Sequence, residues 1–144
     1  MIWFNGRLPE ADSVDRMGAD NMAGLLGIEF VAAGEDWLQM RMPVTALTQQ
    51  PFGRLHGGAS IVLAETIGSV AAASCVDRDT HLAVGMEING NHVRPAYDGW
   101  VIATARPESI GRTTHVWSIR IEDEQGRLIC ISRFTVAIIP KERR

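Results

Sequence analysis

The stretch between Arg54 and Asp77 holds the residues whose types and spacing could do chemistry. Among the 22 residues that separate these two, Glu65 is the one formally charged side chain, and His56 is the one other group that titrates near neutrality. An ionised carboxylate is costly to bury without a partner. Glu65 is therefore expected at a surface, in a contact with a partner, or in a functional pocket.

The triplet His56-Gly57-Gly58 comes directly before a helix predicted over residues 59–76. The first backbone N–H groups of a helix have no partner within it, and the helix dipole is positive at that end. Such a start can hold an anion or stabilise an oxyanion. Two glycines can also simply allow a sharp turn into a helix, and it is Glu65, eight residues further on, that favours the functional interpretation.

The spacing of Gly57 and Glu65 sets a geometric problem. Eight residues at 1.5 Å per residue separate them by about 12 Å along one helix. A donor and a nucleophile that act on the same carbonyl must both lie within about 3–3.5 Å of it. Two antiparallel helices packed through small residues would bring Gly57 of one subunit opposite Glu65 of the other, so the sequence predicts a two-fold homodimer with shared sites.

The helices and strands that must position these residues are predicted from hydrophobic periodicity and from turn residues such as glycine and proline. A helical segment is expected within residues 1–26. Two strands in a hairpin come next, and a polar loop over 43–54 leads to the long helix. Four further strands are expected as an antiparallel meander. The six predicted strands cover residues 28–31, 37–42, 82–93, 100–108, 114–122 and 127–138. One long helix on a six-stranded sheet is an α+β domain.

Composition limits the alternatives. The 144 residues, 46% of them hydrophobic, suit a single domain over 1–144. A net charge of −3 argues against a nucleic-acid partner. Cys75 and Cys130 are too few for a disulfide framework or a metal site and indicate the cytoplasm. Residues 55–76 are long enough to span a membrane, but Glu65 and His56 favour a buried helix in a protein that does not enter the membrane.

Three ordered motifs carry a resemblance to a known family: residues 50–53 (QPFG) followed by 55–60 (LHGGAS), residues 64–70 (AETIGSV), and residues 87–94 (EINGNHVR). With these motifs the chain resembles the hotdog-fold acyl-CoA thioesterases of the PaaI-like group. Within this group it is similar to the branch that contains 1,4-dihydroxy-2-naphthoyl-CoA hydrolases and the proofreading thioesterases of the enterobactin pathway. The resemblance spans nearly the whole chain, and it implies an antiparallel six-stranded sheet wrapped around one long central helix.

The resemblance also implies catalytic roles. Glu65 would attack the thioester carbonyl or activate water as a general base, while the N–H of Gly57 polarises the carbonyl. Gln50 and His56 would bind and orient the thioester, with His56 also able to fix the local loop. Ser69 occupies the position of a small hydroxyl residue that holds water.

Further residues are implied in substrate binding. His92 would line the acyl pocket and could hydrogen-bond a ring hydroxyl, and Val70 would leave room for a bicyclic ring. CoA would pass Gly85 and Met86 toward the turn at Arg112-Thr113, which could equally be a solvated hairpin turn. His81 and His115 are treated as surface or strand histidines, and Arg94 could equally be structural.

The function that the resemblance implies is hydrolysis of an aromatic acyl-CoA, most concretely 1,4-dihydroxy-2-naphthoyl-CoA in menaquinone biosynthesis. Alternatives are proofreading of an aryl or acyl carrier protein, a broad-specificity aryl- or phenylacetyl-CoA thioesterase, and a non-catalytic acyl-CoA-binding regulatory domain. No cofactor is expected, because CoA is part of the substrate. The homodimers are expected to pair into a homotetramer.

Overall fold

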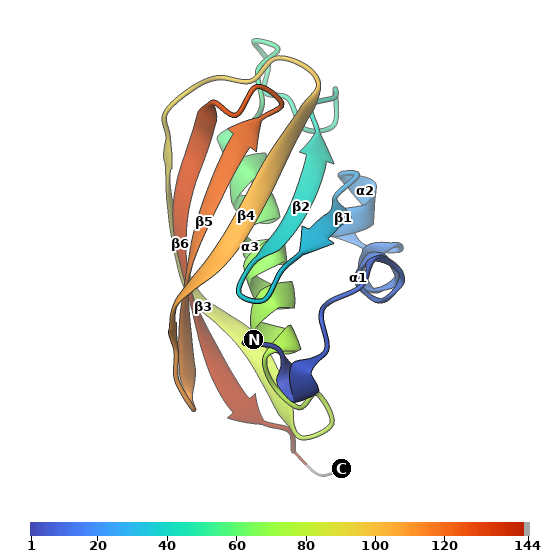
Figure 1. Cartoon of the computed structure of the whole chain (residues 1–144). Helices are drawn as coiled ribbons and strands as arrows, with labels where there is room; N and C mark the ends of the chain where they lie inside the picture. Colours follow the sequence, from blue (N-terminus) through green and yellow to red (C-terminus); the bar gives the residue numbers. More distant parts are fainter. Residues whose placement is uncertain (143–144) are drawn as a thin grey trace.

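The computed structural model describes residues 1–142, and residues 143 and 144 of the predicted domain lie outside this range. Three short helical elements come first: η1 Phe4–Gly6, α1 Ala11–Gly18 and α2 Met22–Leu25. The long helix is α3 Gly57–Ser74. The strands are β1 Glu29–Ala33, β2 Leu38–Pro43, β3 His81–His92, β4 Trp100–Ile110, β5 Thr114–Asp123 and β6 Leu128–Pro140 (Figure 1).

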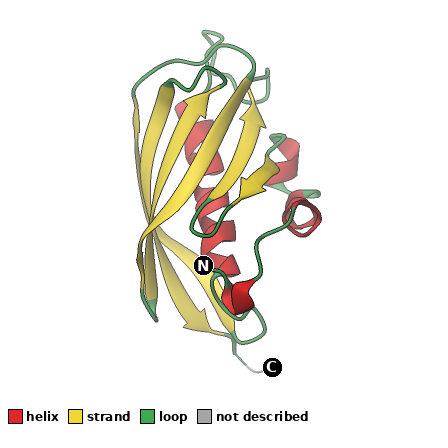
Figure 2. Ribbon diagram, viewed as in Figure 1, coloured by secondary structure: helices red, strands yellow, loops and turns green. Residues whose placement is uncertain are grey.

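The six strands form one antiparallel sheet in the order β1-β2-β4-β5-β6-β3. The sheet curves around α3, which crosses the molecule from end to end (Figure 2). The predicted α+β architecture, with a six-stranded sheet around one long helix, is confirmed. The hairpin of β1 and β2 is also as predicted, with Phe30 paired to Met40.

The expected meander of the last four strands is wrong in one place. β4, β5 and β6 do follow one another, but β3 pairs with β6 at the edge of the sheet and not with β4. Residues 93–99 carry the chain past two strands to reach β4 at Trp100. Three strand spacings amount to about 14 Å, a distance that seven residues can span, so the length of this connection did not decide which strands pair.

Helix α3 begins and ends two residues before its predicted bounds. Its buried face includes Leu63 and Ile67, which are fully buried in the same core as Trp117 and Phe134. Each such aliphatic side chain contributes about 1.5–3 kcal/mol when buried. The helix is long and apolar enough to cross a membrane, but its position under the sheet makes it the core helix.

The N-terminal segment lies on the side of α3 that the sheet leaves open (Figure 1). Trp3 is buried, and its indole Nε1 donates a hydrogen bond to the carbonyl oxygen of Gly34 over 2.7 Å. Val14 of α1 is also buried in the main core. This segment therefore packs against the hairpin of β1 and β2 and against α3.

Candidate active site

The loop over residues 44–56 brings Gln50 and His56 to the start of α3. The hydroxyl of the buried Thr48 is hydrogen-bonded within the loop and to the end of β2. The N–H of His56 donates to the carbonyl oxygen of Thr48 over 2.8 Å. The side-chain oxygen of Gln50 accepts a hydrogen bond from the N–H of Phe52. These bonds fix the loop from which both predicted side chains extend.

One backbone N–H is left free where α3 begins. His56 caps the helix, because its Nδ1 accepts a hydrogen bond from Gly58 N–H over 2.8 Å. The N–H groups of Ala59 and Ser60 both donate to the carbonyl oxygen of His56. Within residues 1–142 the N–H of Gly57 has no acceptor. It lies at the positive end of the helix, where it can stabilise an oxyanion.

A cavity of about 330 Å³ opens beside this helix start and is lined by Gln50, Gly57 and His92. A methyl group built on Gly57 would lie 2.8 Å from Nε2 of His92, so glycine lets this ring lie against the helix. Arg54 and Arg94 also line the cavity, and neither forms an ion pair within residues 1–142. Of the described residues, no Asp or Glu lines it. The cavity therefore suits an anionic or carbonyl-bearing ligand.

Glu65 lies in the middle of α3, with its side chain exposed. It lines a second cavity, of about 460 Å³, together with Ser69 and Val70. The backbone of β3 comes close to its carboxylate: a methyl group built on Gly85 would lie 2.7 Å from Oε1 of Glu65. The strand carries a bulge between Gly85 and Glu87. Bulges are common beside active sites, where they redirect the backbone.

The two cavities share no lining residue. One chain by itself keeps Gly57 and Glu65 about 12 Å apart along α3, as the spacing predicts. Several of the small residues around Glu65 are used within the chain itself. Ala64, Gly68 and Ala72 are buried under the chain's own sheet, and a methyl group on Gly68 would overlap the ring of Phe134. These three small residues therefore pack inside the chain's own fold, whereas Ser69 and Ala73 stay half-buried.

The residues predicted to meet the nucleotide end of CoA gather at one end of the sheet. Arg112 and Thr113 are exposed in the turn between β4 and β5. Thr114 pairs with Ala137, which in turn pairs with Val84 next to Gly85 and Met86. His92 pairs with Cys130 near the opposite end of β3. Within one chain, Arg112 and His92 are therefore far apart.

Several titratable groups lie away from both cavities. His115 is a strand residue with its side chain only 1% exposed, and Nδ1 has no hydrogen-bond partner within residues 1–142. Burial lowers the pKa of His115, and a hydrogen bond to the backbone of Gly111 opposes this only in part. Burial raises the pKa of the Cys75 thiol to about 12, so Cys75 is no thiolate nucleophile at neutral pH. Within the described chain no three His, Cys, Asp or Glu residues lie close enough together to hold a metal ion.

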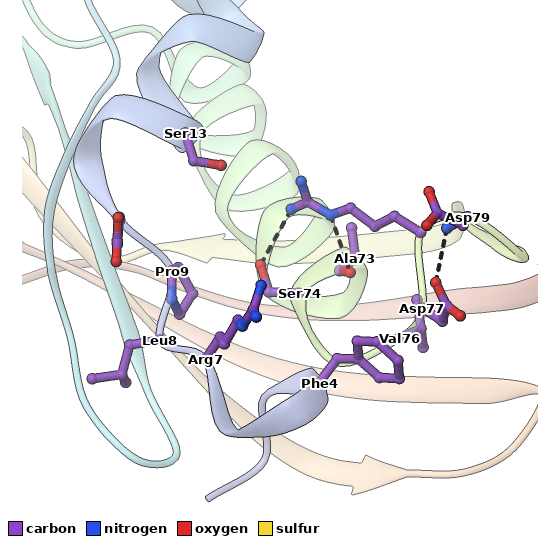
Figure 3. Close-up of a pocket in the computed structure, with 12 residues that line it drawn as sticks. Phe4, Arg7, Leu8, Pro9, Ser13, Ala73, Ser74, Val76, Asp77 and Asp79 are labelled. Atoms are coloured by element: carbon purple, nitrogen blue, oxygen red, sulfur yellow. Dashed lines mark hydrogen bonds between the residues drawn. The ribbon is translucent and has the colours of Figure 1, made fainter.

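A third hollow, of about 550 Å³, lies where the N-terminal segment meets the end of α3. The Arg78 guanidinium donates hydrogen bonds to the carbonyl oxygen of Ala73 and to the hydroxyl of Ser74, and both of these acceptor residues line the hollow at the end of the helix (Figure 3). Arg7 and Asp77 lie nearby, so both signs of charge line the hollow. It contains none of the predicted site residues.

Some residues that line the Gly57 and Glu65 cavities were not predicted from the sequence. Ser60 lines the Gly57 cavity and is only 1% exposed. Thr66 lines the Glu65 cavity, and its position next to Glu65 could have suggested it. Met17 and Met22 line the same cavity from the N-terminal segment, and no local pattern indicates a contact so distant in sequence.

Comparisons with known proteins agree with this architecture. A family model described as the thioesterase superfamily matches residues 52–130. The 1,4-dihydroxy-2-naphthoyl-CoA hydrolase of Escherichia coli is 49% identical over 96% of this chain and 100% of its own length. The proofreading thioesterase EntH of Cronobacter turicensis is 42% identical over 96% of this chain and 99% of its own. The crystal structure of a mutant of the thioesterase PA1618 from Pseudomonas aeruginosa superposes with a TM-score of 0.95 at 42% identity, covering 98% of this chain and all of that one.

Proposed function

The chain belongs to the thioesterase superfamily and is a thioester hydrolase, and we propose that its substrate is an aromatic acyl-CoA, most concretely 1,4-dihydroxy-2-naphthoyl-CoA. The observation that carries the proposal is the largely apolar cavity of about 460 Å³ beside the carboxylate of Glu65. Its volume falls within the range of small-molecule sites, about 300–1,000 Å³. The relative of that name, aligned along nearly the whole chain, supports the same substrate.

The chemistry follows from two groups. The free N–H of Gly57 stabilises the negative charge that develops on the thioester oxygen. Glu65 then acts in one of two ways. It attacks the carbonyl carbon to form an anhydride that water hydrolyses, or it takes a proton from a water molecule that attacks directly. Either route breaks the carbon–sulfur bond and releases CoA thiol and the free acid.

Binding of the acyl group follows from the side chains around these two groups. Val70 is small enough to leave space for a second aromatic ring in the Glu65 cavity, and the hydroxyl of Ser69 can hold the water. His92 and Gln50, on the Gly57 side, can donate hydrogen bonds to a ring hydroxyl and to the thioester. A cytoplasmic location fits this substrate class and the two free thiols of the described chain.

A complete site then requires two chains. β3 is an edge strand, and an edge presents unpaired backbone groups to another chain. Its exposed side chains include Leu82, Val84 and Met86. We propose that two copies pair through this edge about a two-fold axis, so that Gly57 of one chain meets Glu65 of the other. Arg112 and Thr113 would then meet the CoA phosphates at the shared site.

The test is thiol release from 1,4-dihydroxy-2-naphthoyl-CoA and benzoyl-CoA by the wild type, Glu65→Ala and Glu65→Gln. Loss of a general base typically costs about 10²–10⁴ in rate, and we expect both variants to lose activity to that extent while they still bind substrate. Equal rates in wild type and variants would remove Glu65 from the mechanism. Tight binding of acyl-CoA with no thiol release by the wild type would support the non-catalytic alternative.

A second candidate is proofreading of an aryl carrier protein, which the likeness to EntH favours. The two substrates share a phosphopantetheine thioester and differ in the group attached to its far end, which is a nucleotide in one and a protein in the other. We expect kcat/KM to be higher for the acyl-CoA than for the same acyl group on its carrier protein. A preference of about a hundredfold for the carrier, near 2.8 kcal/mol at 1.4 kcal/mol per factor of ten, would overturn the acyl-CoA assignment.

A further inference from the structure

The cavity beside Glu65 has two walls of different character. The inner wall belongs to α3, whose main-chain hydrogen bonds and buried face hold it rigidly in the core. The outer wall belongs to α1, α2 and the turn between them, and it contributes Val14, Met17, Gly18, Asn21, Met22 and Ala23. The family model covers residues 52–130 and leaves out this outer wall, which the alignments with individual relatives over 96–98% of the chain include.

The outer wall is attached to the fold at defined points. The N–H of Phe30 in β1 donates a hydrogen bond to Oδ1 of Asp15 over 2.8 Å. Asn21 caps α2 by accepting a hydrogen bond from Ala23 N–H, and its Nδ2 donates to the carbonyl oxygen of Met17 over 2.8 Å. These bonds fix the backbone that carries the cavity-lining side chains.

The methionines of this wall are not held by core packing. Met22 is 61% exposed although it lines the cavity, and Met17 is also exposed. Methionine has an unbranched, flexible side chain whose sulfur makes favourable contacts with the edges of aromatic rings. Two such side chains opposite a rigid helix can therefore adapt to an aromatic group that lies between them and Glu65.

We propose that α1 and α2 form the outer wall of the acyl-binding pocket, and that Met22 and Met17 determine the size and aromatic character of the acyl group that is hydrolysed. This inference rests on the proposed thioesterase function at Glu65. These methionines do not touch the reacting carbonyl, so their effect is on acyl selectivity and not on the chemical step. The ligand they select is a planar aromatic acyl group larger than a single ring.

The test compares Met22→Trp with Leu25→Trp. Leu25 lies on the same short helix and is similarly exposed, at 66%, but it does not line the cavity. Each variant is assayed with naphthoyl-CoA, benzoyl-CoA and acetyl-CoA, and its melting temperature is recorded. We expect Met22→Trp to lower kcat/KM for naphthoyl-CoA by at least about tenfold, mainly through KM, with little change for acetyl-CoA. Leu25→Trp should leave all three values unchanged.

A second pair of variants enlarges the cavity where Met22→Trp fills it. Met17→Ala and Met22→Ala enlarge the cavity and remove the sulfur contacts, so the preference for naphthoyl-CoA over acetyl-CoA should narrow. The proposal is overturned if Met22→Trp and Leu25→Trp have the same acyl selectivity. It is also overturned if the methionine variants lower kcat/KM by the same factor for all three substrates. A wild type that hydrolyses none of the three would instead contradict the proposed function.

Discussion

At the scale of single residues, Gly85 is the point at which strand β3 comes close to the carboxylate of Glu65, the predicted nucleophile or general base. A side chain at this position would press on the carboxylate of Glu65 and on the ring of Phe134. Gly90 lies on the same strand and also faces α3, where a methyl group would meet the end of Ile61. A glycine-to-alanine substitution can therefore be compared at two positions of one strand, of which only Gly85 contacts Glu65.

We predict that Gly85→Ala and Gly90→Ala each cost about 1–3 kcal/mol in the free energy of unfolding, because both overfill a packed contact. Only Gly85→Ala should also lower kcat, by about tenfold to a hundredfold, since it displaces the carboxylate from the carbonyl it serves. Urea unfolding and steady-state kinetics check both. Equal kcat values in the two variants would mean that the position of Glu65 is not set by β3.

The buried imidazole of His115 gives the fold a pH dependence. Its pKa in the folded protein is below the ordinary value of 6.5, because burial disfavours the charged ring more than its backbone hydrogen bond favours it. In acid the unfolded chain therefore takes up a proton near pH 6.5, while the folded protein does not. Below pH 6.5 the unfolded state binds more protons than the folded state, so the free energy of unfolding falls as the pH falls. The contribution of the uncharged His115 to stability is therefore fully present above pH 6.5.

We predict that His115→Leu removes this part of the pH dependence. The variant loses the hydrogen bond to the backbone of Gly111, which lowers its stability at every pH, whereas Nδ1 has no hydrogen-bond partner among the described residues to lose. The test is therefore the change of stability with pH and not its absolute value. Denaturant unfolding between pH 8 and pH 5 should give a smaller decrease in stability for the variant than for the wild type. Parallel curves would show that His115 does not titrate differently in the folded and unfolded states.

At the scale of elements, the start of α3 combines a structural and a functional role in one side chain. The Nδ1 atom of His56 caps the helix by accepting the hydrogen bond from Gly58. The ring proton is then on Nε2, from which it can be donated to a substrate. His56→Ala removes both functions, whereas His56→Asn replaces the cap with one of the preferred cap residues.

We predict that His56→Ala lowers the free energy of unfolding by about 0.5–2 kcal/mol and that His56→Asn retains it. Both variants should lose activity, because neither presents a donor where Nε2 lies. Chemical denaturation and kcat/KM separate the two roles. Full activity in His56→Asn would limit His56 to capping the helix.

The helices and strands were largely predictable from the sequence, but which strands pair with each other was less so. The hairpin of β1 and β2, the long helix and the four later strands all follow from local periodicity and turn residues, which depend on nearby sequence. The pairing of β3 with β6 depends on where residues 93–99 travel, and seven residues suit a hairpin loop as well as a crossing. Glu65 stood out because it is the one formally charged side chain between Arg54 and Asp77, and Gly57 because it lies where the helix begins, eight residues before Glu65. Met17 and Met22 become relevant only through packing.

At the scale of the whole molecule, the proposed site combines two cavities that lie at separate positions on α3, and its test is complementation between two chains. Gly57→Ala keeps its backbone N–H, but its methyl group would press on the ring of His92 beside the proposed carbonyl site, so this variant is expected to be inactive through a blocked site. We predict that Glu65→Ala, also expected to be inactive alone, regains activity when it is mixed with Gly57→Ala and the subunits exchange. Equal mixing makes half of the dimers heterodimers with one intact site each, so recovery should reach about a quarter of the wild-type activity per chain.

Exchange itself is verified by labelling the two variants and following energy transfer between them. No recovery despite complete exchange would place Gly57 and Glu65 of one site in the same chain. Light scattering on the wild type then separates a dimer from the expected tetramer, at two or four times the 15.8 kDa chain mass.

The position of β6 between β5 and β3 also governs how the chain can be made in a cell. The ribosome releases α3 and β3 long before β6, which is the last strand in sequence order among the described residues. At about 5–20 residues per second, the apolar face of α3 and the whole length of β3 wait several seconds for the strand that completes their cover. The sheet that covers α3 can therefore be completed only after β6 has been translated, and until then the apolar face of the central helix lacks the strand that packs against Gly68.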